Sequence, residues 1–290
     1  MYNFEKYDFH DQLIIELLYW IEINLNHRLT MERASKKTGY SRWYLQRLFK
    51  SKTGYSLGKY IRDRRLSMAA TALRLSNTSI QDISYYFSYD SQQTFTRTFK
   101  KNFAQTPAAY RRSRKWNMGS TTSPLLIGDF PTPSFEFVEL PYMEFIGQTQ
   151  RHSYSIEALF NPEMHVHRDM LRSFLQEPMS LQSTVWGLSE CVPKEVHDSL
   201  IEMDMLYTVG REKSSDFGKD IPAILAIPAG RYLKIDYIHD MGRLNEYRLY
   251  LYRVFFPTLN LQFRYGHDVE KYSKTIMKKG VTCEYYIPIV

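Results

Sequence analysis

The chain has 290 residues, enough for two domains, and a formal net charge of +7. The positive charge is uneven, because residues 1–115 hold 21 Lys and Arg against 9 Asp and Glu, whereas residues 116–290 hold 17 against 22. No apolar run approaches the roughly 20 residues that span a bilayer, and a start with Glu5, Asp8 and Asp11 is unlike a signal peptide. We therefore expect no membrane contact and a basic first half that binds phosphate.

The first elements form a helix-turn-helix pattern. Apolar residues at helical spacing predict a helix from Phe9 to Asn26, and a shorter helix follows from Thr30 to Thr38. Gly39 supplies a turn in which a left-handed backbone is easy. Ser41, a preferred N-cap residue, then starts the helix SRWYLQRLFK. Helix, tight turn and second helix are the parts of that DNA-binding motif.

A long helix from Ser56 to about Leu75 separates this motif from a second copy. It has an apolar stripe that we expect to be buried, and it takes its charge from Arg62, Arg64, Arg65 and Arg74. The second copy runs from Ser79 through Tyr86 and restarts at Ser91, as SQQTFTRTFK. Ser88 stands in its turn where a glycine is expected, which adds a local cost.

The last helix of each copy carries the same polar pattern, fifty residues apart. The first places Trp43, Gln46, Arg47 and Lys50 on one face, and the second places Gln93, Thr96, Arg97 and Lys100 there. In a major groove Gln pairs with adenine, Arg pairs with guanine, and Thr offers a methyl group to thymine. We interpret both as DNA recognition helices. The alternative is a pair of amphipathic helices with solvated faces.

The long helix has a mechanical consequence. One protein molecule would present two reading helices to successive major grooves, which lie about 34–36 Å apart. The site need not be palindromic, since the two reading faces differ. If the helix keeps its length, the DNA bends to admit both.

The N-terminal half ends in a basic run. Thr106 and Pro107 predict the start of a last short helix, and the run after it includes Arg111 and Arg112, which serve either as phosphate contacts or as a solvated end. The stretch NMGSTTSP then changes the composition. We divide the chain into an all-α domain at 1–115, a linker at 116–124 and a second domain at 125–290.

The second domain alternates short strands with helices. Strands are expected within 135–147, 185–188, 203–209, 223–228, 231–237 and 282–289, and helices within 161–175 and 241–256. This mixture predicts an α+β domain with a mainly antiparallel sheet. Cys191 and Cys283 are unpatterned and suit a reducing cytosol.

These residues carry a family resemblance. SRWYLQRLFK, TGYSLGKYIRDRRLS and DSQQTFTRTFKKNFAQTPAAYRRS resemble the DNA-binding domain of AraC/XylS transcription activators across residues 8–113. PAGRYLKIDY, FFPTLNLQFRYGHDVEKY and CEYYIPI resemble, more weakly, the gyrase-inhibitor-like class of small-molecule-binding domains. The resemblance implies a cytoplasmic, nucleoid-associated bacterial activator. It would bind asymmetric promoter DNA as a monomer and recruit RNA polymerase at multidrug and stress-response genes.

The resemblance also implies site residues. Carried across position by position, the base-reading residues are Trp43, Gln46 and Arg47 in the first helix and Gln92, Gln93, Thr96 and Arg97 in the second, with Thr94 near the backbone. Trp43 shares a face with polar residues, which favours DNA contact over a core position. The departure at Ser88 affects the placement of the second reading helix rather than its role.

The function of the second domain is open between three hypotheses. As a sensor, it would hold a small-molecule effector, for instance an organic cation, through one acid among aromatic rings. The resemblance suggests Glu284 for the acid, and the candidate walls are Trp186, Tyr207, Tyr232 and Tyr285. The same aromatic residues could equally be core. A hydrolase using Glu284 and a passive partner-binding domain are the other two hypotheses.

We nevertheless expect no enzyme, no metal and no cofactor. No G-x-S-x-G, P-loop, H-E-x-x-H or C-x-x-C motif occurs. His165 and His167 lie on a predicted helix, where rings two residues apart diverge and make a poor metal pair.

Overall fold

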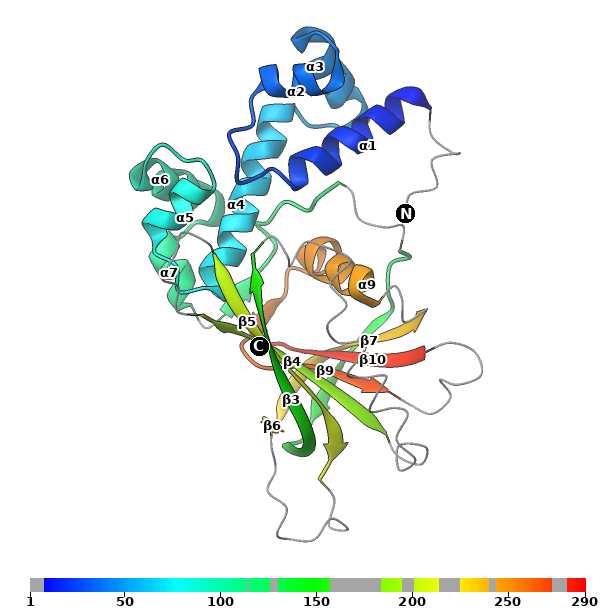
Figure 1. The fold of residues 1–290 in the computed structure, drawn as a ribbon. Helices are drawn as coiled ribbons and strands as arrows, with labels where there is room; N and C mark the ends of the chain where they lie inside the picture. Colours follow the sequence, from blue (N-terminus) through cyan, green and yellow to red (C-terminus); the bar gives the residue numbers. More distant parts are fainter. Residues whose placement is uncertain are drawn as a thin grey trace.

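The computed structural model describes residues 8–113, 115–125, 130–156, 184–194, 201–213, 225–239, 244–272 and 281–290. The first part is a bundle of short helices around one longer helix, α4 (Figure 1). Its elements are α1 (Phe9–Glu22), α2 (Met31–Thr38), α3 (Arg42–Thr53), α4 (Leu57–Leu75), α5 (Ile80–Tyr86), α6 (Gln92–Phe103) and α7 (Pro107–Arg112).

Side-chain caps start these helices where the sequence predicts them. Ser41 Oγ accepts a hydrogen bond from the backbone N–H of Tyr44, and Ser91 Oγ accepts one from that of Thr94. Each cap satisfies an N–H that the first turn of a helix leaves without a partner. The helix starts at Ser41 and Ser91 are therefore confirmed.

In both helix-turn-helix copies, the residue that follows the last helix has a left-handed backbone conformation. Gly54 follows α3 with a φ of 77°, and Ala104 follows α6 at the matching position with a φ of 57°. Ser88 has a φ of 59°, so the serine does occupy a position that favours glycine. Its hydroxyl donates to the carbonyl of Asn26, 3.1 Å away, which ties this turn to the end of the first helical segment.

Helix α4 is largely buried between the two motifs. Its apolar stripe is in the core, as predicted, but Arg64 and Arg74 are each only 3% exposed. Arg64 pairs with Glu22 of α1, and Arg74 donates to the carbonyls of Ser113 and Lys115. Arg65 donates to the carbonyls of Leu25 and His27, so three of the four arginines assigned to the charge of this helix hold it to its neighbours instead.

The second part is a curled antiparallel sheet with a helical segment against one side (Figure 1). Its strands are β2 (Phe135–Leu140), β3 (Met143–Ser155), β4 (Val185–Pro193), β5 (Glu202–Glu212), β6 (Leu225–Ile227), β7 (Gly230–His239), β9 (Asp268–Tyr272) and β10 (Val281–Pro288). They lie in the order β2-β7-β10-β9-β4-β5-β3-β6. The helical segment is α9 (Leu244–Tyr250), the π-helical η5 (Leu251–Phe255) and α10 (Phe256–Leu259).

Alternation along the strands divides the domain core into two clusters. On β10, Tyr285 packs in the cluster that includes the helical segment, and Tyr286 packs in the other. On β7, Leu233 and Tyr232 divide in the same way. Consecutive residues of one strand therefore belong to different faces of the sheet.

The predicted architecture, an all-α domain followed by an α+β domain, is confirmed. The strand β3 runs well beyond the predicted region, because Gln148–Ser155 continue its pairing with β5. The expected helix at 161–175, with His165 and His167, lies outside the described residues. No helix among those described is both long and apolar enough to cross a membrane.

The segment between the domains packs against α4. Residues 115–117 form β1 (Lys115–Asn117), which pairs with β8 (Gln262–Arg264) of the second domain. The N–H of Thr122 donates to Ser67 Oγ at 2.7 Å, and that of Leu125 donates to Tyr60 Oη at 3.2 Å. This segment therefore lies against the N-terminal helical domain along part of its length.

Candidate DNA-binding interface and the second domain

Helix α3 turns its predicted reading face to solvent. Leu45 and Phe49 are fully buried, and the predicted contact residues are exposed, namely Trp43, Gln46, Arg47 and Lys50. Trp43 is 66% exposed, which is unusual for so large an apolar ring. The guanidinium of Arg47 lies 4.7 Å from the centre of the Trp43 ring. Stacking of this kind holds the Arg47 side chain along the helix surface.

Helix α6 repeats the arrangement. Phe95 and Phe99 are fully buried. The exposed predicted residues are Gln93, Thr94, Arg97 and Lys100, whereas Gln92 and Thr96 are half-buried. Thr94 is partly engaged in the cap, because Ser91 Oγ lies 3.0 Å from its hydroxyl. The polar faces of both helices are thus free of the protein core, as a groove-reading face must be.

The long helix α4 sets the separation of these faces. Figure 1 shows α2 and α3 near one end of α4, with α5 and α6 near the other. Its 19 residues correspond to about 28 Å at the usual helical rise. That length is of the same order as one turn of DNA, about 34–36 Å.

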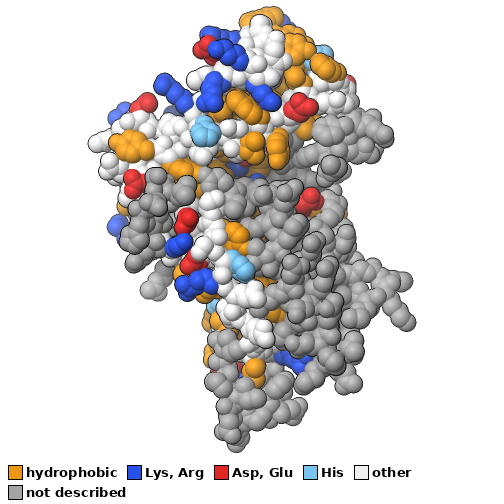
Figure 2. All heavy atoms as spheres, in the orientation of Figure 1, with side chains coloured by type: hydrophobic (Ala, Val, Ile, Leu, Met, Phe, Trp, Pro, Cys, Tyr) orange, Lys and Arg blue, Asp and Glu red, His pale blue; other side chains and the backbone are white. Residues whose placement is uncertain are grey.

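Basic side chains surround the helical part. Figure 2 shows Lys and Arg side chains gathered over the N-terminal helices on the face that it draws. Within the predicted basic run, Arg112 is exposed. Arg111 instead donates to the carbonyls of Leu73 and Thr78, so it connects α7 to the end of α4.

The five residues suggested for a ligand pocket do not share one face of the sheet. Trp186 and Tyr232 pack in one cluster, whereas Tyr207 and Tyr285 pack in the other. Glu284 lies beside Tyr285 on β10, and its carboxylate accepts a hydrogen bond from Tyr286 at 3.0 Å. Glu284 is therefore on the face of Trp186 and Tyr232.

The carboxylate of Glu284 already has two cationic partners. Its oxygens lie 3.1 Å from Lys234 Nζ and 2.9 Å from Lys271 Nζ. Partial burial raises the pKa of Glu284, but the hydrogen bonds from Lys271, Lys234 and Tyr286 outweigh it and the net shift is downward. A cationic ligand would compete with both lysines for this group.

A buried carboxylate that sequence reasoning missed lies on the opposite face. Glu270 is 0% exposed. Tyr207 and Tyr272 each donate to its Oε2, at 2.8 and 2.7 Å, and Arg248 Nη1 lies 3.3 Å from its Oε1. The signal was the alternation of DVEKY, in which Glu270 shares its face with the inward-pointing Tyr272.

A second, half-buried acid lies two residues earlier. Asp268 accepts hydrogen bonds from Tyr252 and, at 2.7 Å, from Tyr285. Burial raises the pKa of Asp268 despite these two donors. Among the residues that the structure describes, no group of His, Cys, Asp and Glu side chains could hold a metal ion.

Comparison with known proteins agrees with this architecture. Residues 34–113 match a helix-turn-helix domain model, and residues 133–290 match a GyrI-like small molecule binding domain model. The chain therefore belongs to the AraC-type transcriptional regulators that join a DNA-binding helix-turn-helix domain to a GyrI-like domain.

Within this class the chain is Rob-like, as the sequence motifs suggest. It is 37% identical over 284 residues to the Right origin-binding protein of Escherichia coli (strain K12), covering 96% of this chain and 98% of that protein. It is also 37% identical over 287 residues to the Transcriptional regulator Rob of Salmonella typhimurium, with the same coverage. A solved structure, the C-terminal domain of the response regulator AraT from Geobacillus stearothermophilus, is 28% identical, with a TM-score of 0.34 over 35% of this chain and 85% of that one.

Proposed function

We propose that the protein is a transcription activator that binds asymmetric promoter sites as a monomer, with α3 and α6 in adjacent major grooves. The observation that carries this proposal is the pair of exposed reading faces at the two ends of α4. Arg47 and Arg97 are the residues for guanine, and Gln46 and Gln93 are those for adenine. Lys50, Lys100 and Arg112 lie at the surface to contact phosphates.

The activator would recruit RNA polymerase at multidrug and stress-response genes in the bacterial cytoplasm. This part of the proposal rests on the similarity to Rob and to the regulatory protein SoxS. We further propose that the second domain controls activity in response to a small molecule, in keeping with its match to a small molecule binding domain. A hydrolase centred on Glu284 is less favoured, because two lysines already hold that carboxylate.

Selection of bound duplexes from a random DNA pool, followed by footprinting, tests the proposal. We expect a non-palindromic site, protected in two adjacent major grooves on one side of the duplex, with one protein molecule per site. Light scattering of the complex gives that stoichiometry. Protection of a single groove, or tight binding only by a dimer on an inverted repeat, would refute this mode of binding.

A further inference from the structure

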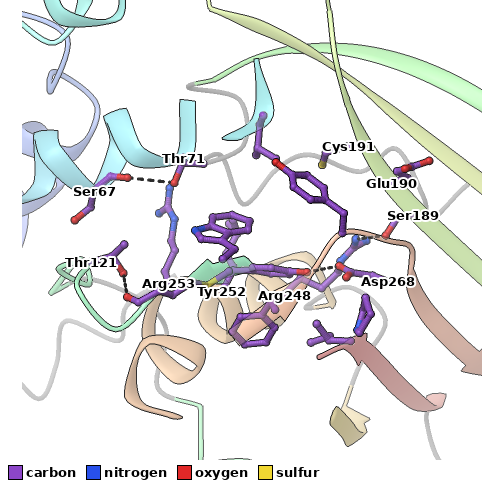
Figure 3. Close-up of a pocket in the computed structure, with 18 of the residues that line it drawn as sticks. Ser67, Thr71, Thr121, Ser189, Glu190, Cys191, Arg248, Tyr252, Arg253 and Asp268 are labelled. Atoms are coloured by element: carbon purple, nitrogen blue, oxygen red, sulfur yellow. Dashed lines mark hydrogen bonds between the residues drawn. The ribbon is translucent and has the colours of Figure 1, made fainter. Parts of the chain in front are cut away.

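A cavity of about 240 Å³ lies between the DNA-binding domain and the second domain. Figure 3 shows Ser67 and Thr71 of α4 on one side of it, and Arg248 and Tyr252 of the second domain on another. None of the five ligand residues suggested by the sequence lines this cavity. It is therefore a separate site, and it belongs to both domains.

The walls of the cavity are mostly apolar. Met68 and Leu75 contribute from α4, and the rings of Trp116, Phe263 and Tyr265 contribute from β1, β8 and the turn after β8. The volume is below the roughly 300–1,000 Å³ of pockets that hold drug-sized ligands. A molecule of about two fused aromatic rings is small enough for this volume and apolar enough for these walls.

The charged side chains of the lining are mainly cationic. Four arginines line the cavity, namely Arg64, Arg248, Arg253 and Arg264, against the two acids Glu190 and Asp268. Both acids are engaged, since Glu190 lies 3.2 Å from His267 Nε2 and Asp268 accepts from two tyrosines. The two acids therefore offer little to an incoming cation.

Arg264 is the arginine best placed to accept a new anionic partner. Its guanidinium stacks 4.7 Å from the centre of the Tyr232 ring. Its Nη2 is buried and has no hydrogen-bond partner among the described residues. No acidic side chain among the described residues pairs with this guanidinium, so an anion bound in the cavity would supply its counter-charge.

Arg253 adds to the positive potential of the cavity. Burial and the neighbouring Arg64 guanidinium lower the pKa of Arg253 to about 9. Arg64 itself is paired with Glu22. The charges of that pair largely cancel, so Glu22 does little to neutralise the positive charge of Arg253. An anion in the cavity would stabilise the charged form of Arg253.

We propose that this interdomain cavity binds a small organic anion with a flat apolar body, its anionic group held by Arg264 and Arg253. A bound molecule would touch α4 directly, and α4 carries both reading motifs. Occupancy and DNA binding would therefore influence each other by the same factor in both directions. Binding of the anion does not depend on the proposed function. Only the expected coupling between the anion and DNA rests on the proposal that the protein binds DNA through α3 and α6.

Calorimetry on the full-length protein without DNA tests binding itself. The probes are naphthalene-2-carboxylate, the neutral naphthalene-2-methanol and the cationic naphthalen-2-ylmethylammonium, which share one ring system. We expect the carboxylate to bind at least about tenfold more tightly than either analogue, since a hydrogen bond to a charged group is worth that much. Equal affinity for the three, or binding of none, would overturn the proposal, whatever the outcome of the DNA selection.

Variants then locate the site. Arg264→Met should weaken carboxylate binding at least about tenfold, Arg264→Lys should restore part of it, and Thr71→Phe should abolish it by filling the cavity from α4. Arg151→Met, at an exposed arginine that does not line the cavity, should leave binding unchanged. Thermal unfolding verifies that each variant is folded. The comparison of the three probes uses the wild-type protein, so it does not depend on the folding of any variant. Tight binding that survives both Arg264→Met and Thr71→Phe would place the ligand elsewhere and refute the site.

Discussion

Arg64 and Glu22 form a two-point ion pair, with Arg64 Nε 2.9 Å from Glu22 Oε1 and Nη2 2.8 Å from Oε2. The pair joins α4 to α1, and Tyr60 donates to the same carboxylate at 2.7 Å. Arg64 also donates to the carbonyl of Thr122, in the segment that leads to the second domain. One buried group of side chains therefore connects the first helix, the long helix and the interdomain segment.

Glu22→Gln should destabilise the protein by about 3–5 kcal/mol, because it leaves the buried Arg64 guanidinium without its counter-charge. Denaturant unfolding measures this loss, and Glu16→Gln, at an exposed position of the same helix, is the matched control with little effect. Equal destabilisation by both variants would contradict the assigned role of the pair.

The ion pair between Glu22 and Arg64 also predicts that the stability of the protein depends on pH. Burial raises the pKa of Glu22, but Arg64 and Tyr60 outweigh it, so the folded-state pKa lies below the ordinary value of 4.5. The stability that this group contributes is therefore complete above that value and is lost as the pH falls through the folded-state pKa. Unfolding of the wild type between neutral and acidic pH should show this loss, and Glu22→Gln should reduce it.

Substitutions on α6 should separate base reading from phosphate contact. Arg97→Ala should cost about 1–3 kcal/mol of binding and relax specificity at its own base pair. Lys100→Ala should weaken binding to all sequences alike and reduce the dependence of affinity on salt. Gel shifts at several salt concentrations, on the selected site and on single-base variants of it, distinguish the two effects. Identical behaviour of the two variants would remove the base-reading assignment.

Trp43 should act on DNA binding partly through Arg47. The stacking of the two side chains is worth about 0.5–1 kcal/mol at an exposed site. A double-mutant cycle of Trp43→Ala and Arg47→Ala should therefore show a coupling of about that size in the binding free energy. Strict additivity would mean that the tryptophan does not position the arginine.

Ala104→Gly should stabilise the N-terminal domain by about 1 kcal/mol, because alanine at a φ of 57° bears the steric cost of the left-handed conformation. Gly54→Ala, at the matching place in the first motif, should destabilise by a similar amount. A Cβ at Gly54 would have no neighbour within 4 Å, so the expected loss is due to backbone strain alone. Thermal unfolding of both variants measures the effect, and a loss of stability in Ala104→Gly would contradict it.

Gly187→Ala should destabilise the second domain by about 1–3 kcal/mol through overpacking. A Cβ at Gly187 would lie 2.4 Å from Tyr207 Oη and 2.8 Å from Glu270 Oε2, which places it inside their hydrogen bond. Gly58→Ala is the control, since a Cβ there has open space on α4 and gains helix propensity. Denaturant unfolding followed by near-ultraviolet circular dichroism reports the change. Wild-type stability of Gly187→Ala would show that the buried group tolerates rearrangement.

The sequence by itself determined the N-terminal domain almost completely. Its signals are local, because the N-caps Ser41 and Ser91 and the apolar spacing each act within one or two helical turns. The same local signals occur twice, fifty residues apart. For this reason the exposed polar faces of α3 and α6 follow from the printed residues. Local signals also predicted the antiparallel character of the second domain.

Only the tertiary structure decided which charged residues are internal. Arg64 and Arg74 appear in sequence as the polar part of an amphipathic helix, and their burial depends on Glu22 and on two carbonyls about forty positions away. In the second domain, the pairing of β9 with β4 and β10 places Glu270 among tyrosines from distant strands. The interdomain cavity has no sequence signature for the same reason. Burial and charge pairing come from contacts between segments far apart in the chain, and no local pattern encodes which segments will meet.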